Sequence, residues 1–383
     1  MKKIKVALFE IEYHLGFVQT LVSLINKNKY EISLYTIKSN IDDLKVYLDK
    51  DFNKIKIISE NNKFKLLYKF FRISKKIKIA FIFSIQDHFL LLPFRFLFFP
   101  LCKTVLIAFR PENYTFNFTN QNYTIKQYIV EFVFNFFRYI IAKKSDALIT
   151  NGEELKKRLK KSHSDKKVII NIPYTLRDFK KKIKKNNNKY FVIGVPGSLS
   201  ENRRDYFKML ELFEGLKNYK DKFKLVFIGY VNSNTVSKKK VTNNYYINLK
   251  NKINHMKKIG FNIKYFNKRL NEKNYQREID NCDMMYSHLH LGSYEDKGWT
   301  GAYCWTISHN KILFTNNTND RMEFKVIGEN YRNDEEFYLK IKKIFSNKKY
   351  YFKKNSLNVK KYFSKADWKI IFEKNLNKIL SLK

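Results

Sequence analysis

The sequence has only three cysteines in 383 residues, Cys102, Cys282 and Cys304. They lie far apart and form no C-x-x-C pair, which argues against a disulfide framework and against a structural zinc site. A reducing cytoplasm fits this scarcity. The opening MKKIKVALFEIEYHLG has a short apolar run that Glu10 and Glu12 break, so it predicts a first strand rather than a signal peptide.

Acidic residues are also scarce. The chain has 35 Asp and Glu against 76 Lys and Arg, a formal net charge of +41, which attracts polyanions such as nucleic acid, anionic lipid or nucleotide phosphates. Lysine and asparagine also crowd segments without a pattern, such as KKKIKKNNNKY, so part of the excess reflects a compositional habit. The 44% hydrophobic and 17% aromatic content excludes a disordered chain.

Long apolar runs are absent too. No segment reaches the roughly 18 to 20 uninterrupted apolar residues of a transmembrane helix. The nearest is HFLLLPFRFLFFPLCKTVLIAF, residues 88–109, which Pro93, Arg95, Pro100 and Lys103 interrupt. Basic and aromatic residues alternate here and in NKFKLLYKFFRISKKIK before it. The pattern is typical of contact with an anionic membrane surface, or of two core helices that flank a buried strand.

What the sequence does contain is an alternation of β-branched apolar runs with helical stretches. This pattern is typical of parallel α/β sheets buried on both faces, and the length favours two domains of under about 200 residues each. We predict an N-terminal Rossmann-like domain over 1–176, a polar and basic linker over 177–189, and a second Rossmann-like domain over 190–350. A helical segment, 351–383, could pack back on the N-terminal domain.

The stretch VIGVPGSLSENRRDYFKML, residues 192–210, runs from a strand through a turn into a helix. The first amides of a helix lack internal partners and favour an anion, and arginine forks suit phosphate. We therefore predict that Gly197, Ser198, Arg203 and Arg204 bind a phosphate. The alternative is an exposed loop whose arginines pair with the nearby Asp and Glu.

A second glycine-containing loop lies in SHLHLGSYEDKGWTGAYCWTISHNKILF, residues 287–314. Gly298, Thr300 and Gly301 open the next helix, where small residues let backbone amides approach a diphosphate. The alternative is a plain helix start. The two histidines of SHLH share a strand face, but no third ligand accompanies them, so we predict no metal site.

These two loops, in this order of elements, resemble the two-domain (GT-B) glycosyltransferases of the family-4 type. That family has a G-R-x-x-x-x-x-K-G stretch at the donor diphosphate, and here Arg204 falls on the lysine while Ser198 replaces the arginine. Its Y-E-G-F-G-L-P-x-x-E stretch aligns with YEDKGWTGAYCW if two residues are inserted. Glu295 then matches the sugar-binding glutamate, and Trp305 stands where the ribose-binding glutamate would be.

The resemblance implies two Rossmann-like domains facing each other across a cleft. It implies transfer of a sugar from a nucleotide-sugar to a glycan or lipid-linked saccharide, with retained configuration and without a metal or other cofactor. Glu295 would be catalytic, and Lys268, Arg269 and Trp305 would contact the nucleotide. It further implies cell-surface polysaccharide or lipopolysaccharide synthesis at the cytoplasmic face of the membrane, where the basic aromatic segments would touch anionic lipid.

Polar residues follow three predicted strands of the first domain. They are His14 and Gly16, Asp87 and His88, and Arg110 and Glu112. Carboxylates and histidines at strand ends can carry protons or bind sugar hydroxyls. We predict catalytic roles for His14 and Asp87 and acceptor-side positions for the others; the alternative is that they simply close their strands.

Two other functions remain open. A nucleic-acid-binding protein would account for the charge and the many aromatic residues. However, the aromatics follow apolar strand and helix patterns and no known nucleic-acid-binding motif occurs, so we expect no nucleic-acid partner. A sugar-nucleotide epimerase of the same two-domain shape is the other alternative.

Overall fold

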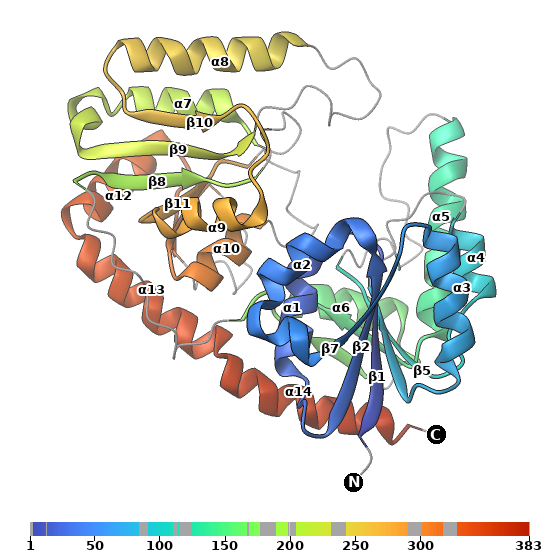
Figure 1. Cartoon of the computed structure of the whole chain (residues 1–383). Helices are drawn as coiled ribbons and strands as arrows, with labels where there is room; N and C mark the ends of the chain where they lie inside the picture. The colour runs from blue at the N-terminus through green and yellow to red at the C-terminus, as the bar shows by residue number, and fades with distance from the viewer. Residues whose placement is uncertain are drawn as a thin grey trace. The chain divides into compact units, whose positions relative to one another are not determined.

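The computed structural model describes residues 3–12, 14–83, 91–109, 114, 125–166, 168–176, 189–197, 199, 204–230, 243–289, 301–316 and 328–382. The chain divides into two compact units (Figure 1). Unit 1 comprises Met1–Tyr174 and Lys365–Lys383, and unit 2 comprises Thr175–Ser364. The last helix of the chain therefore belongs to the same unit as the first strand.

Unit 1 is built on a parallel sheet of seven strands in the order β3-β2-β1-β4-β5-β6-β7. The strands are β1 (Ile4–Glu10), β2 (Tyr30–Ile37), β3 (Lys56–Glu60), β4 (Ile79–Ile82), β5 (Lys103–Ile107), β6 (Ala147–Thr150) and β7 (Ile169–Asn171). The helices are α1 (Leu15–Leu24), α2 (Ile41–Leu48), α3 (Lys63–Ser74), α4 (Leu91–Leu97), α5 (Ile125–Lys144), α6 (Glu153–Ser162) and α14 (Lys365–Leu380).

Helices cover both faces of this sheet. Phe70 of α3 and Ile141 of α5 are buried in the cluster on one face. On the other face the ring of Phe372, from α14, lies 6.0 Å from the ring of Phe81 on β4. The inner strands are consequently buried along their whole length, as IAFI in β4 and ALIT in β6 are, which is why the sequence shows continuous apolar runs rather than alternation.

Unit 2 repeats the plan with six parallel strands in the order β10-β9-β8-β11-β12-β13. The strands are β8 (Phe191–Val195), β9 (Phe223–Tyr230), β10 (Ile263–Phe266), β11 (Met284–Ser287), β12 (Ile312–Thr315) and β13 (Gly328–Asn330). The helices are α7 (Tyr206–Glu214), α8 (Asn243–Lys258), α9 (Glu272–Asp280), α10 (Gly301–His309), α12 (Asp334–Ser346) and α13 (Lys348–Phe363).

The core of unit 2 also has two layers. Residues of α7, α8 and α12 pack with one face of the sheet, and Ile279 of α9 packs with Val192 and Met285 on the other. Asparagine and aspartate fix where helices begin. Asp205 accepts a hydrogen bond from the backbone of Lys208 at 2.8 Å to open α7, as preferred N-cap residues do. The predicted α/β class with two Rossmann-like domains is confirmed.

Strand order places a switch point in each sheet. In unit 1 the chain builds outward from β1 through β2 on one side and from β4 on the other, and in unit 2 it does the same from β8 and β11. Ligands of open parallel sheets bind at such points, beyond the carboxyl ends of the strands. The segments after β1, β4, β8 and β11 are therefore where a site is expected.

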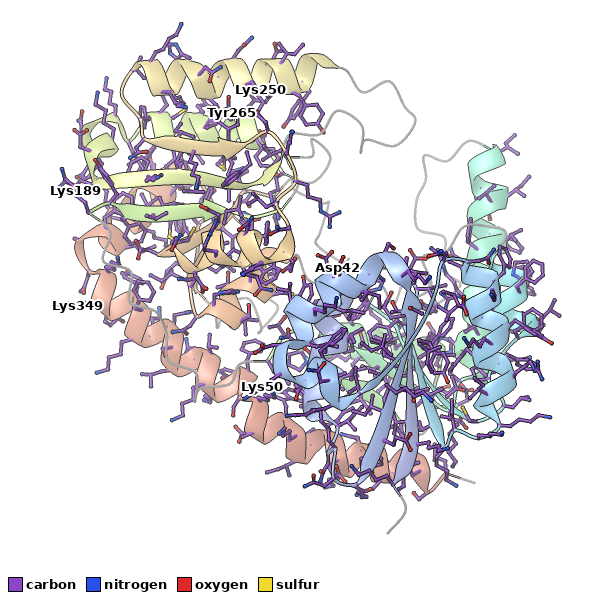
Figure 2. The ribbon with its side chains drawn as sticks, viewed as in Figure 1. Asp42, Lys50, Lys189, Lys250, Tyr265 and Lys349 are labelled. Atoms are coloured by element: carbon purple, nitrogen blue, oxygen red, sulfur yellow. The ribbon has the colours of Figure 1, made fainter. Side chains whose placement is uncertain are left out.

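Basic side chains are spread over both units. The exposed side chains of Lys50 in unit 1 and of Lys189 and Lys349 in unit 2 extend outward from their elements (Figure 2). Among the described helices, none is long and apolar enough to cross a membrane.

Candidate functional site

In unit 2 the turn after β8 depends on a glycine. Gly197 has φ +89°, a conformation that side-chain-bearing residues rarely adopt. A Cβ there would lie 2.9 Å from Nη1 of Arg204. The amide of Gly197 donates a hydrogen bond to the hydroxyl of Tyr275 at 2.9 Å. The turn is therefore tight against α9, and its glycine amide already has a protein acceptor.

Arg204 lies beneath this turn and is 6% exposed. Its Nε donates to Oγ of Ser287 at 3.1 Å, and its Nη1 donates to the carbonyl of Pro196 and, at 3.3 Å, to the hydroxyl of Tyr206. Pro196 follows β8 and Ser287 ends β11. The guanidinium therefore ties together the two strand ends that flank the switch point and holds the Gly197 turn in place.

Tyr275 and Trp305 form an aromatic pair beside the turn, with ring centroids 5.4 Å apart. Burial raises the pKa of Tyr275 well above its usual value, so the hydroxyl that accepts from Gly197 keeps its own proton to donate. Trp305 lies one turn into α10, which begins at Gly301. Trp305, which stands in place of the ribose-binding glutamate, thus packs against Tyr275, the residue that supports the Gly197 turn.

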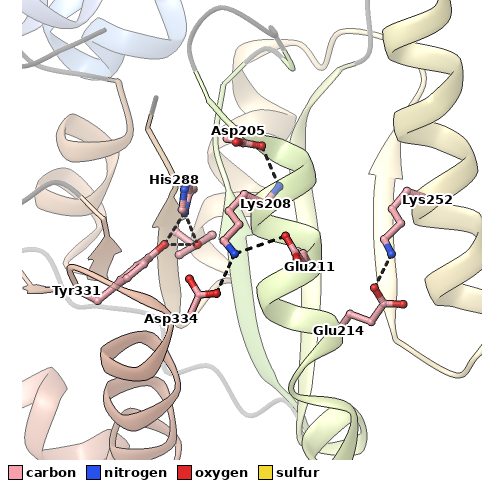
Figure 3. A network of polar contacts seen from close by, with 9 residues as sticks. Asp205, Lys208, Glu211, Glu214, Lys252, His288, Tyr331 and Asp334 are labelled. Carbon is pink, nitrogen blue, oxygen red and sulfur yellow. Dashed lines mark hydrogen bonds and ion pairs between the residues drawn. The ribbon is translucent and has the colours of Figure 1, made fainter. Parts of the chain in front are cut away.

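The end of β11 is held by a second polar cluster (Figure 3). Nδ1 of His288 lies 2.6 Å from the hydroxyl of Tyr331, which lies 2.5 Å from the hydroxyl of Tyr286. Burial raises the pKa of both tyrosines above the ordinary value. Nearby, Lys208 of α7 forms an ion pair with Asp334 of α12 at 2.8 Å. This cluster fixes the strand that leads into the second glycine-containing loop.

Two residues predicted to contact the nucleotide, Lys268 and Arg269, are exposed on the connection between β10 and α9. This connection leaves the carboxyl end of β10, on the same edge of the sheet as the Gly197 turn, because all strands run parallel. Asn271 then caps α9 by accepting from the backbone of Asn274 at 2.9 Å. The structure therefore leaves both cations accessible at the expected edge.

In unit 1 the end of β1 carries a buried acid. Glu10 has no exposed surface, and its Oε1 accepts from the amide of Glu12. Its Oε2 lies 3.0 Å from Nδ1 of His14, whose ring centroid lies 4.8 Å from that of Phe109. A carboxylate at Nδ1 keeps the proton on that nitrogen, which leaves Nε2 of a neutral ring as an acceptor. His14 is therefore oriented for proton transfer or for binding a hydroxyl.

Gly16 lies in the first turn of α1, against an aromatic side chain. A Cβ at Gly16 would lie 3.1 Å from Cε1 of Tyr174. The hydroxyl of Thr20, one turn further along α1, donates to the carbonyl of Tyr174 at 2.8 Å. Because Gly16 has no side chain, Tyr174, which ends the first segment of unit 1, can pack against the start of α1.

The remaining predicted residues lie outside the described part of the chain. They are Asp87, His88, Arg110, Glu112, Ser198, Arg203, Glu295, Gly298 and Thr300. Asp87 and His88 follow β4 in the sequence, next to β1 in the sheet, and Glu295 falls between β11 and α10. Within the described ranges, no group of three His, Cys, Asp or Glu side chains is arranged to hold a metal ion.

Three site residues were not predicted. Glu10 had a visible signal, because an acid follows the apolar run VALF at the end of β1. Ser287 and Tyr275 had none, since a serine at a strand end and a tyrosine in a polar helix are ordinary. Only the packing of α9 beside β8 brings the Tyr275 hydroxyl to the Gly197 amide.

Several solved structures share this fold over nearly the whole chain. A mutant of S. aureus TarM, solved with fondaparinux, alpha-GlcNAc-glycerol and UDP, matches the full length of both chains at a TM-score of 0.64 and 10% identity. The match with Anabaena HepE, solved with UDP, covers 98% of this chain and 100% of HepE, at a TM-score of 0.60 and 10% identity. The match with the UDP-GlcNAc 2-epimerase of Neisseria meningitidis, solved with UDP-GlcNAc, covers 98% of this chain and 100% of the epimerase, at a TM-score of 0.56 and 13% identity.

The chain therefore has the GT-B fold, with two Rossmann-like domains of seven and six parallel strands. No protein-family model matches the sequence, and no curated protein sequence matches it either. At these identities the likeness establishes the fold alone.

Proposed function

We propose that the protein is a glycosyltransferase that moves a sugar from a nucleotide-sugar, in the first instance a UDP-sugar, to a glycan or lipid-linked saccharide. The observation that carries the proposal is the GT-B fold, shared over the whole length with TarM and HepE, both solved with UDP. The sequence resemblance to family-4 enzymes supports the same activity.

The donor would bind at the switch point of unit 2. There the Gly197 turn and the start of α10 leave the carboxyl edge of the sheet, where helix N-termini favour anions. Arg203, the amides near Thr300 and Gly301, and the positive charge of Arg204 would stabilise the leaving diphosphate without a metal ion. In this proposal Arg204 acts mainly through the turn that it braces, because its described hydrogen bonds go to protein atoms.

The acceptor would lie at the switch point of unit 1. Nε2 of His14 would accept a hydrogen bond from the hydroxyl of the sugar acceptor, and the carboxylate of Glu10 would hold the ring in the orientation that presents Nε2. Glu295 would bind the hydroxyls of the transferred sugar. If configuration is retained, as in family-4 enzymes, the leaving phosphate takes the proton and His14 only orients the hydroxyl.

We place the reaction in the synthesis of cell-surface polysaccharide or lipopolysaccharide, at the cytoplasmic face of the membrane. The resemblance supports this setting, as do the exposed basic and aromatic side chains of α3, which suit a site near anionic lipid.

Binding of nucleoside diphosphates tests the donor site first. Thermal stabilisation would be measured with UDP, GDP, ADP and their sugars for the wild type and for Lys268→Ala, Arg269→Ala and Lys273→Ala. Lys273 is exposed on α9 near the proposed base-binding residues and serves as the matched control. We expect one nucleotide to raise the melting temperature of the wild type and of the control. The increase should be smaller in Lys268→Ala and in Arg269→Ala. A folded protein that no nucleotide stabilises would contradict the proposal.

Epimerisation is the second candidate, because a UDP-GlcNAc 2-epimerase shares the fold over nearly the whole chain. An epimerase turns over its nucleotide-sugar without any acceptor, whereas a transferase releases free nucleotide only when an acceptor or water takes the sugar. Incubation with UDP-GlcNAc alone, followed by chromatography of the nucleotide-sugars, separates the two. A new nucleotide-sugar isomer would favour the epimerase.

A further inference from the structure

One surface of unit 1 exposes many large apolar side chains. Of the 19 large hydrophobic side chains exposed among the described residues, 11 lie between residues 64 and 136, on or next to helices α3, α4 and α5. The exposed fraction is 65% for Leu97, 56% for Ile129 and 48% for Tyr68. Soluble proteins rarely gather apolar side chains in this way without a partner surface. We call this surface the α3–α5 face.

The α3–α5 face is continuous and preformed. The three helices lie side by side, α3 next to α4 and α4 next to α5 (Figures 1 and 2). The ring of Phe64 on α3 meets the ring of Phe94 on α4 edge to face at 5.0 Å. From α5, Nζ of Lys144 lies 4.0 Å from the ring centroid of Phe96. Aromatic contacts thus join the helices into one surface.

Its net charge is positive. Residues 60–111 contain ten Lys and Arg against two acids, Glu60 and Asp87, and α5 contains four against one, Glu131. Glu60 forms ion pairs with Lys69 at 3.0 Å and with Lys65 at 3.8 Å, so it offsets only part of this charge. On α3 the exposed Lys65, Lys69 and Arg72 follow helical spacing beside the row of Phe64 and Tyr68. A row of aromatics flanked by a row of cations matches a bilayer interface, where rings lie at the headgroups and cations meet lipid phosphates.

Charge also separates the candidate occupants. A second copy of the chain, docking through the same face about a two-fold axis, would bring two strongly positive surfaces together. An anionic bilayer presents the opposite charge and a place for the apolar side chains. We propose that the α3–α5 face docks unit 1 on anionic lipid. The docking proposal deepens the proposed function. Its last step, that unit 1 once docked presents His14 to acceptors held in the membrane, rests on that function.

Vesicle binding tests the docking. Flotation would use vesicles of phosphatidylcholine alone and of an equimolar mixture with phosphatidylglycerol. The variants are Leu97→Ser with Ile129→Ser for the apolar part and Lys65→Gln with Lys69→Gln for the charge. The controls are Ile370→Ser, 74% exposed on α14 of the same unit, and Lys45→Gln, whose side chain is 58% exposed on α2.

We expect binding to the mixed vesicles only, and weaker binding in added salt. Binding should weaken about fivefold for each lysine removed, because each cation near the surface contributes roughly 1 kcal/mol. It should weaken about tenfold or more in the apolar variant, which loses buried apolar area. Unchanged binding in both face variants, or no binding by the wild type, would overturn the proposal. Self-association that Leu97→Ser with Ile129→Ser abolishes, without vesicle binding, would assign the face to a second copy instead.

The same proteins also separate this proposal from the proposed function. UDP-sugar binding reports on unit 2 and needs no lipid. If a nucleotide-sugar binds while vesicles do not, docking is wrong and the transferase proposal stands. If vesicles bind through the face while no nucleotide-sugar does, docking stands and the transferase proposal fails.

Discussion

The two switch points share a topology and differ in the sign of the charge that supports them. In unit 2 the strand end and turn are held by the buried guanidinium of Arg204, and in unit 1 by the buried carboxylate of Glu10. The first arrangement brings positive charge to the edge where we propose that the diphosphate binds. The second orients His14, which suits a neutral hydroxyl. A common sheet therefore fixes where a site lies, and the residue at the strand end decides its chemistry.

The largest effect should come from removing the cation of unit 2. Arg204→Met leaves the carbonyl of Pro196 and the hydroxyl of Ser287 without their buried donor, and it should cost unit 2 about 3 kcal/mol of unfolding free energy. Hydrogen exchange, followed separately in each unit, measures this loss. Arg332→Met, at an exposed position of the same unit, is the control. Equal protection in Arg204→Met and the control would show that Arg204 does not brace the turn.

A smaller loss of stability is expected from the turn itself. Gly197→Val forces a branched residue into a positive φ and against Arg204, at a cost of about 1 to 3 kcal/mol. Gly260→Val imposes a similar strain at φ +96°, between α8 and β10. Both should lower the melting temperature, but only Gly197→Val should abolish stabilisation by nucleotide. If Gly260→Val abolishes it too, the turn after β8 has no special role.

In unit 1 the comparison predicts a loss of rate rather than of fold. Glu10→Gln and His14→Gln should each reduce sugar transfer about 10- to 100-fold, with little change in nucleotide binding. Because the two side chains act as a pair, the double variant should be no slower than the slower single variant. Steady-state kinetics measures this, with Glu31→Gln, exposed on β2, as the control. Additive effects would mean that Glu10 does not act through His14.

The smallest effect concerns pH and is confined to unit 1. His163 is fully buried, its Nε2 lies 2.7 Å from the carbonyl of Tyr114, and burial lowers its pKa. The unfolded chain therefore binds a proton more readily, so stability falls as the pH drops below the ordinary histidine value of about 6.5. The melting temperature of unit 1 should decline as the pH drops below about 6.5, and the decline should be smaller in His163→Gln. His255→Gln, at an exposed position, should show the same decline as the wild type. The same decline in both variants would contradict the prediction.

Local pattern was enough to predict most elements of the fold. Continuous apolar runs such as IAFI predict strands covered on both faces, and the segment NKFKLLYKFFRISKKIK, for which one interpretation was a core helix, contains α3. The site was predictable only in part. Gly197 and His14 follow strands that the pattern identifies, but the burial of Arg204 does not follow from two arginines in a polar loop. An arginine in a loop is ordinarily solvated, and only packing can desolvate it.

The sequence by itself determined the parallel α/β class, the two-domain plan and the residues at the strand ends, because these depend on periodicity and on residue type along the chain. Tertiary structure alone decided the strand order, and with it that β1 lies beside β4 and β8 beside β11. It also decided that Tyr275 reaches Gly197 and that an acid at a strand end becomes a buried partner of His14. These contacts join residues through space, and their energies depend on burial that no local pattern records.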